Sequence, residues 1–67
     1  MNIDGNELKA MRVSAGVTQS ELGAYLGYFT KGKPNRSVIS RMESGNQDIN
    51  ARIQILVKFF LDSKAGV

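Results

Sequence analysis

Residues 18–45 have the sequence TQSELGAYLGYFTKGKPNRSVISRMESG, and the rest of the chain is arranged around this stretch. Thr18 and Glu21 stand three residues apart, the spacing at which a hydroxyl and a carboxylate each bond a free backbone N–H group at a helix start. We therefore predict that a helix begins at Gln19. Gly23 lies inside this helix, where the absence of a side chain allows a second helix to approach closely.

A second short helix is predicted over residues 36–44. Asn35 is a suitable N-cap residue, and Gly45 is a residue type that commonly follows a helix end. Ile39 and Met42, three residues apart, form the expected inward face and leave a polar outer face. Two short helices of this kind, joined by a turn, are typical of a helix-turn-helix, a motif that binds DNA.

The segment between these two helices is longer than a tight turn. Gly32 and Pro34 prevent a helix from continuing through residues 28–35. We expect an exposed loop here, with Tyr28 or Phe29 packed back onto the core. The two lysines of the loop are either solvated or in contact with DNA phosphates, and the sequence leaves both interpretations open.

The composition indicates one small domain. The chain has 67 residues with no cysteine and no histidine, so its stability must come from a single helical core, helped by oligomerisation. It contains neither a long apolar run nor a signal-peptide pattern, so we expect a cytoplasmic protein that joins the nucleoid when bound to DNA. Residues 28–52 hold five basic and two acidic side chains, and this difference equals the net charge of +3 of the whole chain.

Helices are also predicted on both sides of this motif. Asp4 is the expected N-cap of a helix over residues 5–15, and Leu8 lies on the buried side of that helix. The last helix is predicted from residue 51 to about residue 62, followed by a polar tail over residues 63–67.

Apolar residues lie on two faces of the last helix. One stripe has the spacing of a helix that faces a core, and it consists of Ile53, Leu56, Val57 and Phe60. Ile55 and Phe59 lie four residues apart on another face, which predicts a symmetric dimer interface. A strand over residues 53–61 is rejected because no other segment offers an alternating apolar partner, so we predict an all-α fold.

With these residues in place, the chain resembles the phage repressor and Cro family of helix-turn-helix proteins, also called the xenobiotic-response-element type. The matching segments are LKAMRVSAGVTQSELGAYLG, residues 8–27, and SVISRMESG, residues 37–45. The resemblance implies a single domain over residues 1–67 with the lambda-repressor-like fold of four or five helices. This chain departs from the family by an enlarged turn, which has nine residues (28–36) where about three are usual.

The resemblance also implies which residues contact DNA. The positions at which the family contacts base edges in the major groove are Arg36, Ser37, Ser40 and Arg41. The positions assigned to backbone contacts are Gln19, Asn46 and Gln47, together with Lys31 and Lys33 of the enlarged turn. Arg12 and Glu43 match an ion pair that joins the first helix of the family to its third.

Each of these assignments has a simpler alternative. Arg36 and Arg41 could be solvated side chains, and Arg41 could instead pair with an acid of the chain. Ser37 could support the cap of its helix, and Glu43 could be an ordinary surface acid whose spacing from Arg12 is a coincidence. The sequence alone leaves these alternatives open.

The pattern predicts a sequence-specific double-stranded DNA-binding transcriptional regulator. The resemblance favours a Cro-like repressor of a phage or mobile element, which binds a palindromic operator as a weak homodimer. The alternative is an antitoxin-type protein-interaction module that also regulates its own operon, although residues 62–67 leave little room for a partner-binding extension. We do not expect an enzyme, a cofactor, a metal or a membrane partner, because the chain lacks catalytic histidine or cysteine, a phosphate-binding glycine loop and paired carboxylates.

Overall fold

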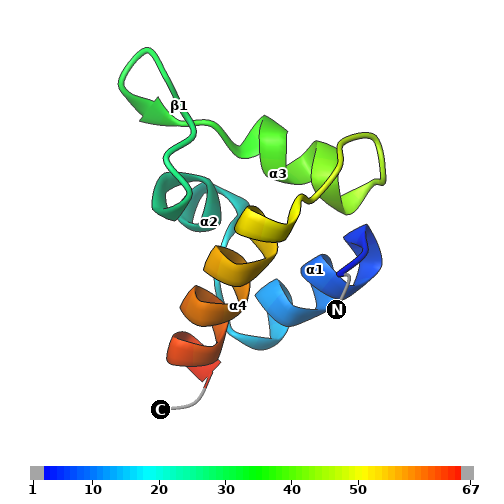
Figure 1. Cartoon of the computed structure of the whole chain (residues 1–67). Helices are drawn as coiled ribbons and strands as arrows, with labels where there is room; N and C mark the ends of the chain where they lie inside the picture. The colour runs from blue at the N-terminus through cyan, green and yellow to red at the C-terminus, as the bar shows by residue number, and fades with distance from the viewer. Residues whose placement is uncertain (1–2, 66–67) are drawn as a thin grey trace.

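The computed structural model describes residues 3–65, and in this range the chain forms four helices and one two-stranded sheet (Figure 1). The elements in chain order are α1 (Gly5–Ser14), α2 (Gln19–Tyr25), β1 (Phe29–Thr30), β2 (Lys33–Pro34), α3 (Arg36–Glu43) and α4 (Ala51–Ala65). In Figure 1, α4 crosses the middle of the domain between α1 and α2, and α3 lies above it. No helix among the described residues is long and apolar enough to cross a membrane.

The helices begin where short-range sequence signals place them. At the start of α2, the Glu21 N–H donates to the Thr18 hydroxyl at 3.0 Å, and the Thr18 N–H donates to the Glu21 carboxylate at 3.1 Å. Asp4 accepts from a backbone N–H of the first turn of α1 at 2.8 Å. The side-chain oxygen of Asn35 accepts from the Ser37 N–H at 3.0 Å. These bonds satisfy backbone donors that have no partner inside the helix.

Two glycines allow helices to touch backbone to backbone. A Cβ on Gly23 would lie 3.0 Å from the carbonyl oxygen of Asn35, which confirms the predicted close approach. A Cβ on Gly5 would lie only 2.5 Å from the carbonyl oxygens of Met42 and Glu43 at the end of α3. Gly5 thus allows the first turn of α1 to pack on the last turn of α3, a role that the sequence does not indicate.

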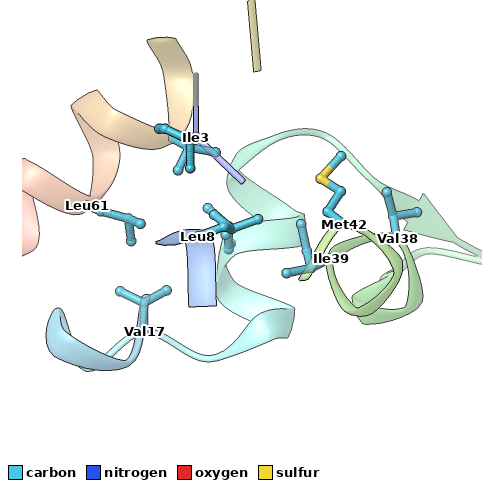
Figure 2. Close-up of a cluster of buried hydrophobic side chains, with 9 residues drawn as sticks. Ile3, Leu8, Val17, Val38, Ile39, Met42 and Leu61 are labelled. Atoms are coloured by element: carbon cyan, nitrogen blue, oxygen red, sulfur yellow. The ribbon is translucent and has the colours of Figure 1, made fainter. Parts of the chain in front are cut away.

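One hydrophobic core lies between the helices (Figure 2). All four helices supply its fully buried side chains, which are Leu8, Leu22, Ile39, Met42, Val57 and Leu61. Ile3, Val17 and Val38 complete the core. Each fully buried aliphatic side chain contributes about 1.5–3 kcal/mol relative to exposure, so removing any one helix would expose a large part of the stabilising surface.

A glutamine side chain joins the start of the described chain to α4. The side-chain oxygen of Gln54 accepts from the Ile3 N–H at 3.1 Å, and its amide nitrogen donates to the Ile49 carbonyl at 2.9 Å. The segment before α1 is therefore attached to the first half of α4.

The last helix is longer than predicted. α4 continues to Ala65, so the expected tail is wrong over residues 63–65, and residues 66–67 lie outside the described range. Lys64 lies 5.7 Å from the centroid of the Phe60 ring, which stacks on Tyr25 of α2 at a centroid distance of 4.2 Å. Through these contacts the last turns of α4 pack on α2, which the polar sequence of residues 62–65 does not indicate.

The buried face of α4 differs from the predicted stripe at one position. Val57 is buried, and Ile53 and Phe60 pack against the core as expected. Leu61 is buried instead of Leu56, which is only half-buried. The core-facing stripe consists of residues 53, 57 and 61, which are four residues apart. This spacing keeps side chains on one side of a helix, and so does the spacing of the predicted stripe.

The second apolar face of α4 is confirmed. Ile55 and Phe59 are 70% and 62% exposed, so the core does not use them.

Residues 28–35 form a β-hairpin, which corrects both the expected irregular loop and the all-α class. The antiparallel pairs are Phe29 with Pro34 and Thr30 with Lys33. Lys31 and Gly32 form the turn with φ of 52° and 79°, and positive φ at both positions is the geometry of a two-residue hairpin turn. Strands of two residues are too short to show an alternating pattern in the sequence.

Pro34 is compatible with this hairpin because of its place in the ladder. The Asn35 N–H donates to the Tyr28 carbonyl at 2.8 Å, so the adjacent pair of Phe29 and Pro34 is of the non-hydrogen-bonded kind. Of the two expected anchors, Tyr28 packs against the core, whereas Phe29 is 54% exposed.

Candidate nucleic-acid interface

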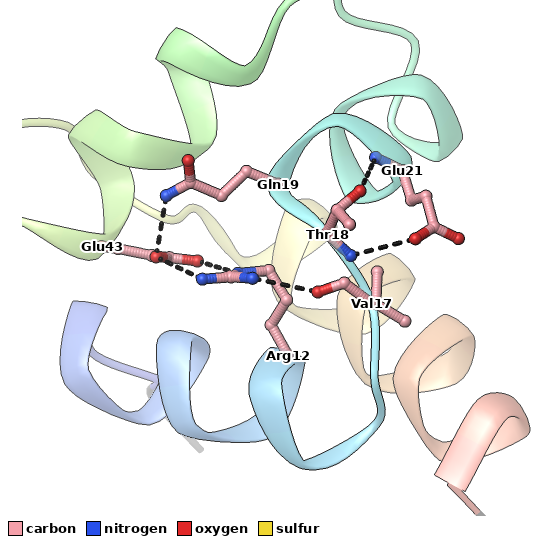
Figure 3. A network of polar contacts seen from close by, with 6 residues as sticks. All are labelled: Arg12, Val17, Thr18, Gln19, Glu21 and Glu43. Carbon is pink, nitrogen blue, oxygen red and sulfur yellow. Dashed lines mark hydrogen bonds and ion pairs between the residues drawn. The ribbon is translucent and has the colours of Figure 1, made fainter.

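A largely buried ion pair joins α1 to α3 (Figure 3). The Arg12 guanidinium donates to both carboxylate oxygens of Glu43, from Nε at 2.6 Å and from Nη2 at 3.2 Å. The remaining terminal nitrogen, Nη1, donates to the Val17 carbonyl at 2.9 Å. The two side chains are only 12% and 5% exposed. The predicted pair is therefore confirmed, and the interpretation of Glu43 as an ordinary surface acid is wrong.

The same carboxylate holds Gln19. The Gln19 side-chain nitrogen donates to the Glu43 oxygen Oε1 at 3.1 Å. Glu43 thus accepts N–H groups from α1 and α2 while it belongs to α3, so it fixes three helices relative to one another (Figure 3). The Gln19 side chain, at the first turn of α2, is therefore held in place by α3.

The outer face of α3 is polar and exposed. Val38, Ile39 and Met42 face the core, whereas the side chains predicted to contact bases are exposed on the opposite face. Together with Gln19, these side chains line one open hollow, formed by Gln19, Arg36, Ser37, Ser40 and Arg41. The structure therefore brings together the predicted phosphate contact and all four predicted base contacts.

The segment after α3 lies beside the end of this surface. The Arg41 Nε donates to the Gln47 side-chain oxygen at 3.2 Å, and the Asn46 amide nitrogen donates to the Ser44 hydroxyl at 3.1 Å. The Asn46 N–H also bonds the Arg41 carbonyl at 2.9 Å, where the chain turns at Gly45 with φ of 84°. The partner of Arg41 is thus an amide and not an acid.

At the start of α3, only the backbone of Ser37 takes part in the cap. Its N–H is the donor to Asn35, while its side chain is exposed and lines the hollow. The lysines of the hairpin, Lys31 and Lys33, are exposed and do not line that hollow. Both belong to the β-hairpin, which directly precedes α3 in the chain (Figure 1).

One basic residue beside this surface was missed from the sequence. Lys9 of α1 is exposed and lines a second hollow together with Gln19, Ser20 and Arg36. Lys9 and Arg12 are three residues apart and so lie on one side of α1. This spacing was the sequence signal that could have placed Lys9 beside the surface.

Within residues 3–65, no group of three histidine, cysteine, aspartate or glutamate side chains could hold a metal ion. Comparisons of the chain with protein-family models, with curated protein sequences and with solved structures found no match. The assignment of a function therefore depends on the geometry of the α2–α3 surface and on the resemblance of its sequence.

Proposed function

We propose that this protein is a sequence-specific double-stranded DNA-binding regulator with a lambda-repressor-like helix-turn-helix. The observation that carries the proposal is the hollow lined by Gln19 and the polar face of α3. Five side chains assigned to DNA contact from sequence lie on this one surface, although they come from two helices. An exposed helix of this kind fits the major groove of B-DNA, which is about 12 Å wide.

Each part of the surface has a distinct role in this proposal. Arg36 and Arg41 donate to guanine O6 and N7, whereas the hydroxyls of Ser37 and Ser40 make less selective bonds to base edges. Gln19 contacts a phosphate from the start of α2 and keeps the register of α3 through its bond to Glu43. Asn46, Gln47 and Lys9 add backbone contacts at the margins of the same surface, which position the protein without selecting sequence.

We propose that the protein binds a palindromic site as a homodimer through α4. A single short recognition helix reads only a few base pairs, so this type of domain uses two half-sites about one helical turn apart. The exposed side chains of Ile55 and Phe59 form a small apolar face that a second copy would cover by two-fold symmetry. The face is small, so the dimer is weak without DNA.

We propose that the protein acts by occupying its operator. Bound protein excludes polymerase from an overlapping promoter, and this is the Cro-like repressor activity of a phage or mobile element that we propose. Its occupancy then follows its own concentration.

Selection of bound duplexes from a random DNA pool tests this proposal. We expect enrichment of one palindromic sequence with half-sites about one helical turn apart. The variant Arg41→Ala, carried through the same selection, should lose the preference at one or two positions of each half-site. Recovery of unenriched random sequence with the wild-type protein would refute sequence-specific binding.

A further inference from the structure

The β-hairpin has two different faces, and one of them is turned toward the body of the domain. Successive side chains of a strand point to opposite faces. The pairing therefore places four residues together on what we call the inner face: Tyr28, Thr30, Lys33 and Asn35. Phe29 and Pro34 share the outer face. Because Tyr28 packs against the core, the inner face begins at the body of the domain and continues outward to Lys33.

Asn35 fixes the hairpin to the start of α3. Its amide nitrogen donates to the Thr30 hydroxyl at 2.9 Å, and its side-chain oxygen accepts from the Ser37 N–H at 3.0 Å. Its carbonyl oxygen lies against Gly23 of α2, where a Cβ would come within 3.0 Å. One residue thus contacts the hairpin, α2 and the first turn of α3, so the direction of the hairpin follows the direction of α3.

The hairpin carries positive charge only. Residues 28–35 include Lys31 and Lys33 and no acid, and neither lysine side chain has a hydrogen bond or an ion pair with any residue of the described range. Lys33 belongs to the ladder and lies on the inner face two pairs beyond Asn35. Lys31 lies in the turn, beyond the last pair, where no ladder contact sets its direction.

We propose that the hairpin is a second DNA-contacting element, and that Lys33 rather than Lys31 bonds a backbone phosphate beside the groove that α3 occupies. This inference depends on the proposed function, because it requires DNA against the outer face of α3. The major groove and its rim have room for a two-stranded ribbon as well as a helix. A lysine held on the face that continues from the start of α3 stays close to the DNA that α3 contacts, and its compact charge suits a phosphate.

Salt dependence of binding tests the role of the two lysines. The affinity for the selected duplex is measured between 50 mM and 200 mM salt for the wild type, Lys33→Gln and Lys31→Gln. Each lost phosphate contact lowers the slope of log affinity against log salt by about 0.9. Over this fourfold change in salt, the factor by which affinity falls should therefore be about 3.5 times smaller for Lys33→Gln than for the wild type. Lys31→Gln should keep the wild-type slope.

A lysine on the opposite side of the domain provides the control. Lys64 lies in the last turn of α4, and this end of the helix lies away from α3 in Figure 1, so Lys64→Gln should also keep the wild-type slope. An unchanged slope for Lys33→Gln, or an equal decrease for Lys31→Gln, would overturn the proposal. If the wild type binds no duplex, the proposed function fails as well, whereas wild-type binding with an unchanged Lys33→Gln slope refutes the hairpin contact alone.

Thr30→Val tests the role of Asn35 in positioning the hairpin. Valine keeps the β-branched shape and removes the hydroxyl that Asn35 bonds, while the cap on α3 remains. In the Thr30→Val background, Lys33→Gln should change the slope by less than half as much as it does in the wild type, and Thr30→Ser should restore the full effect. Equal effects in all three backgrounds would show that Asn35 does not direct Lys33.

Discussion

Glu43→Ala should destabilise the domain by about 3–5 kcal/mol, because it leaves the Arg12 guanidinium buried without an opposite charge. Exposed ion pairs contribute only about 0.2–1 kcal/mol, but water is largely excluded from this pair, whose side chains are 12% and 5% exposed. The substitution also removes the acceptor of the Gln19 amide. The free energy of unfolding of a 67-residue chain is roughly 3–10 kcal/mol, so this one change removes about a third or more of its stability.

Urea unfolding followed by circular dichroism measures this loss. The double-mutant cycle of Arg12→Ala and Glu43→Ala should give a coupling of at least about 1.5 kcal/mol, since contacting residues of one network are not additive. If Glu43→Ala does not fold, Glu43→Gln keeps the shape of the side chain and should still cost about 2 kcal/mol, because it removes the charge that the guanidinium requires. Glu7→Gln, at an exposed acid of α1, is the control and should stay within about 0.5 kcal/mol of the wild type.

The reasoning is refuted if the single variants each cost less than about 1 kcal/mol or if their effects are additive. Either result would mean that solvent replaces the ion pair at little cost, and that the three helices are held by the apolar core alone.

Further substitutions test the other contacts. Gly5→Ala should cost about 1–3 kcal/mol or more in urea unfolding, because its Cβ would overlap two backbone carbonyls of α3 that cannot move aside, whereas Asn6→Ala on the exposed side should be close to neutral. Arg41→Ala should keep the fold and lose about 1–3 kcal/mol of preference for the selected site in gel shifts, and an equal loss on scrambled DNA would identify a phosphate contact instead. Phe59→Ala and Ile55→Lys should weaken binding to a palindromic site far more than to a single half-site. Equal losses on both would place dimerisation elsewhere.

The parts of the fold that could be predicted are those set by local chemistry. The cap at Thr18 needs only a partner three residues away, and the inward face of α3 follows from the spacing of Ile39 and Met42. The grouping of Gln19 with the polar face of α3 was also predictable, because the polar side chains have a fixed spacing along α3 and the resemblance supplied Gln19.

The features that could not be predicted depend on contacts between distant parts of the chain. The packing role of Gly5 is one of them, because nothing near it in sequence indicates that the end of α3 packs on it. The sequence around Pro34 predicts a loop, because the tolerance of a strand for proline depends on which pair of the ladder it occupies. The burial of Leu61 depends on where α4 crosses the other helices, and two faces of the helix are apolar enough to serve as the core.

The bond between Ile3 and Gln54 has a consequence for the order in which the protein forms. It closes a loop of 51 positions, and the apolar side chains of α1 share one core with those of α4. Loop closure on this scale must precede the contacts that compensate for its entropy, so the docking of α4 comes late. During synthesis α1, α2 and α3 emerge before α4, and the core lacks Val57 and Leu61 until α4 docks. We therefore expect a single cooperative transition, in which the surface formed by Gln19 and the polar face of α3 appears at the same moment as the last helix docks.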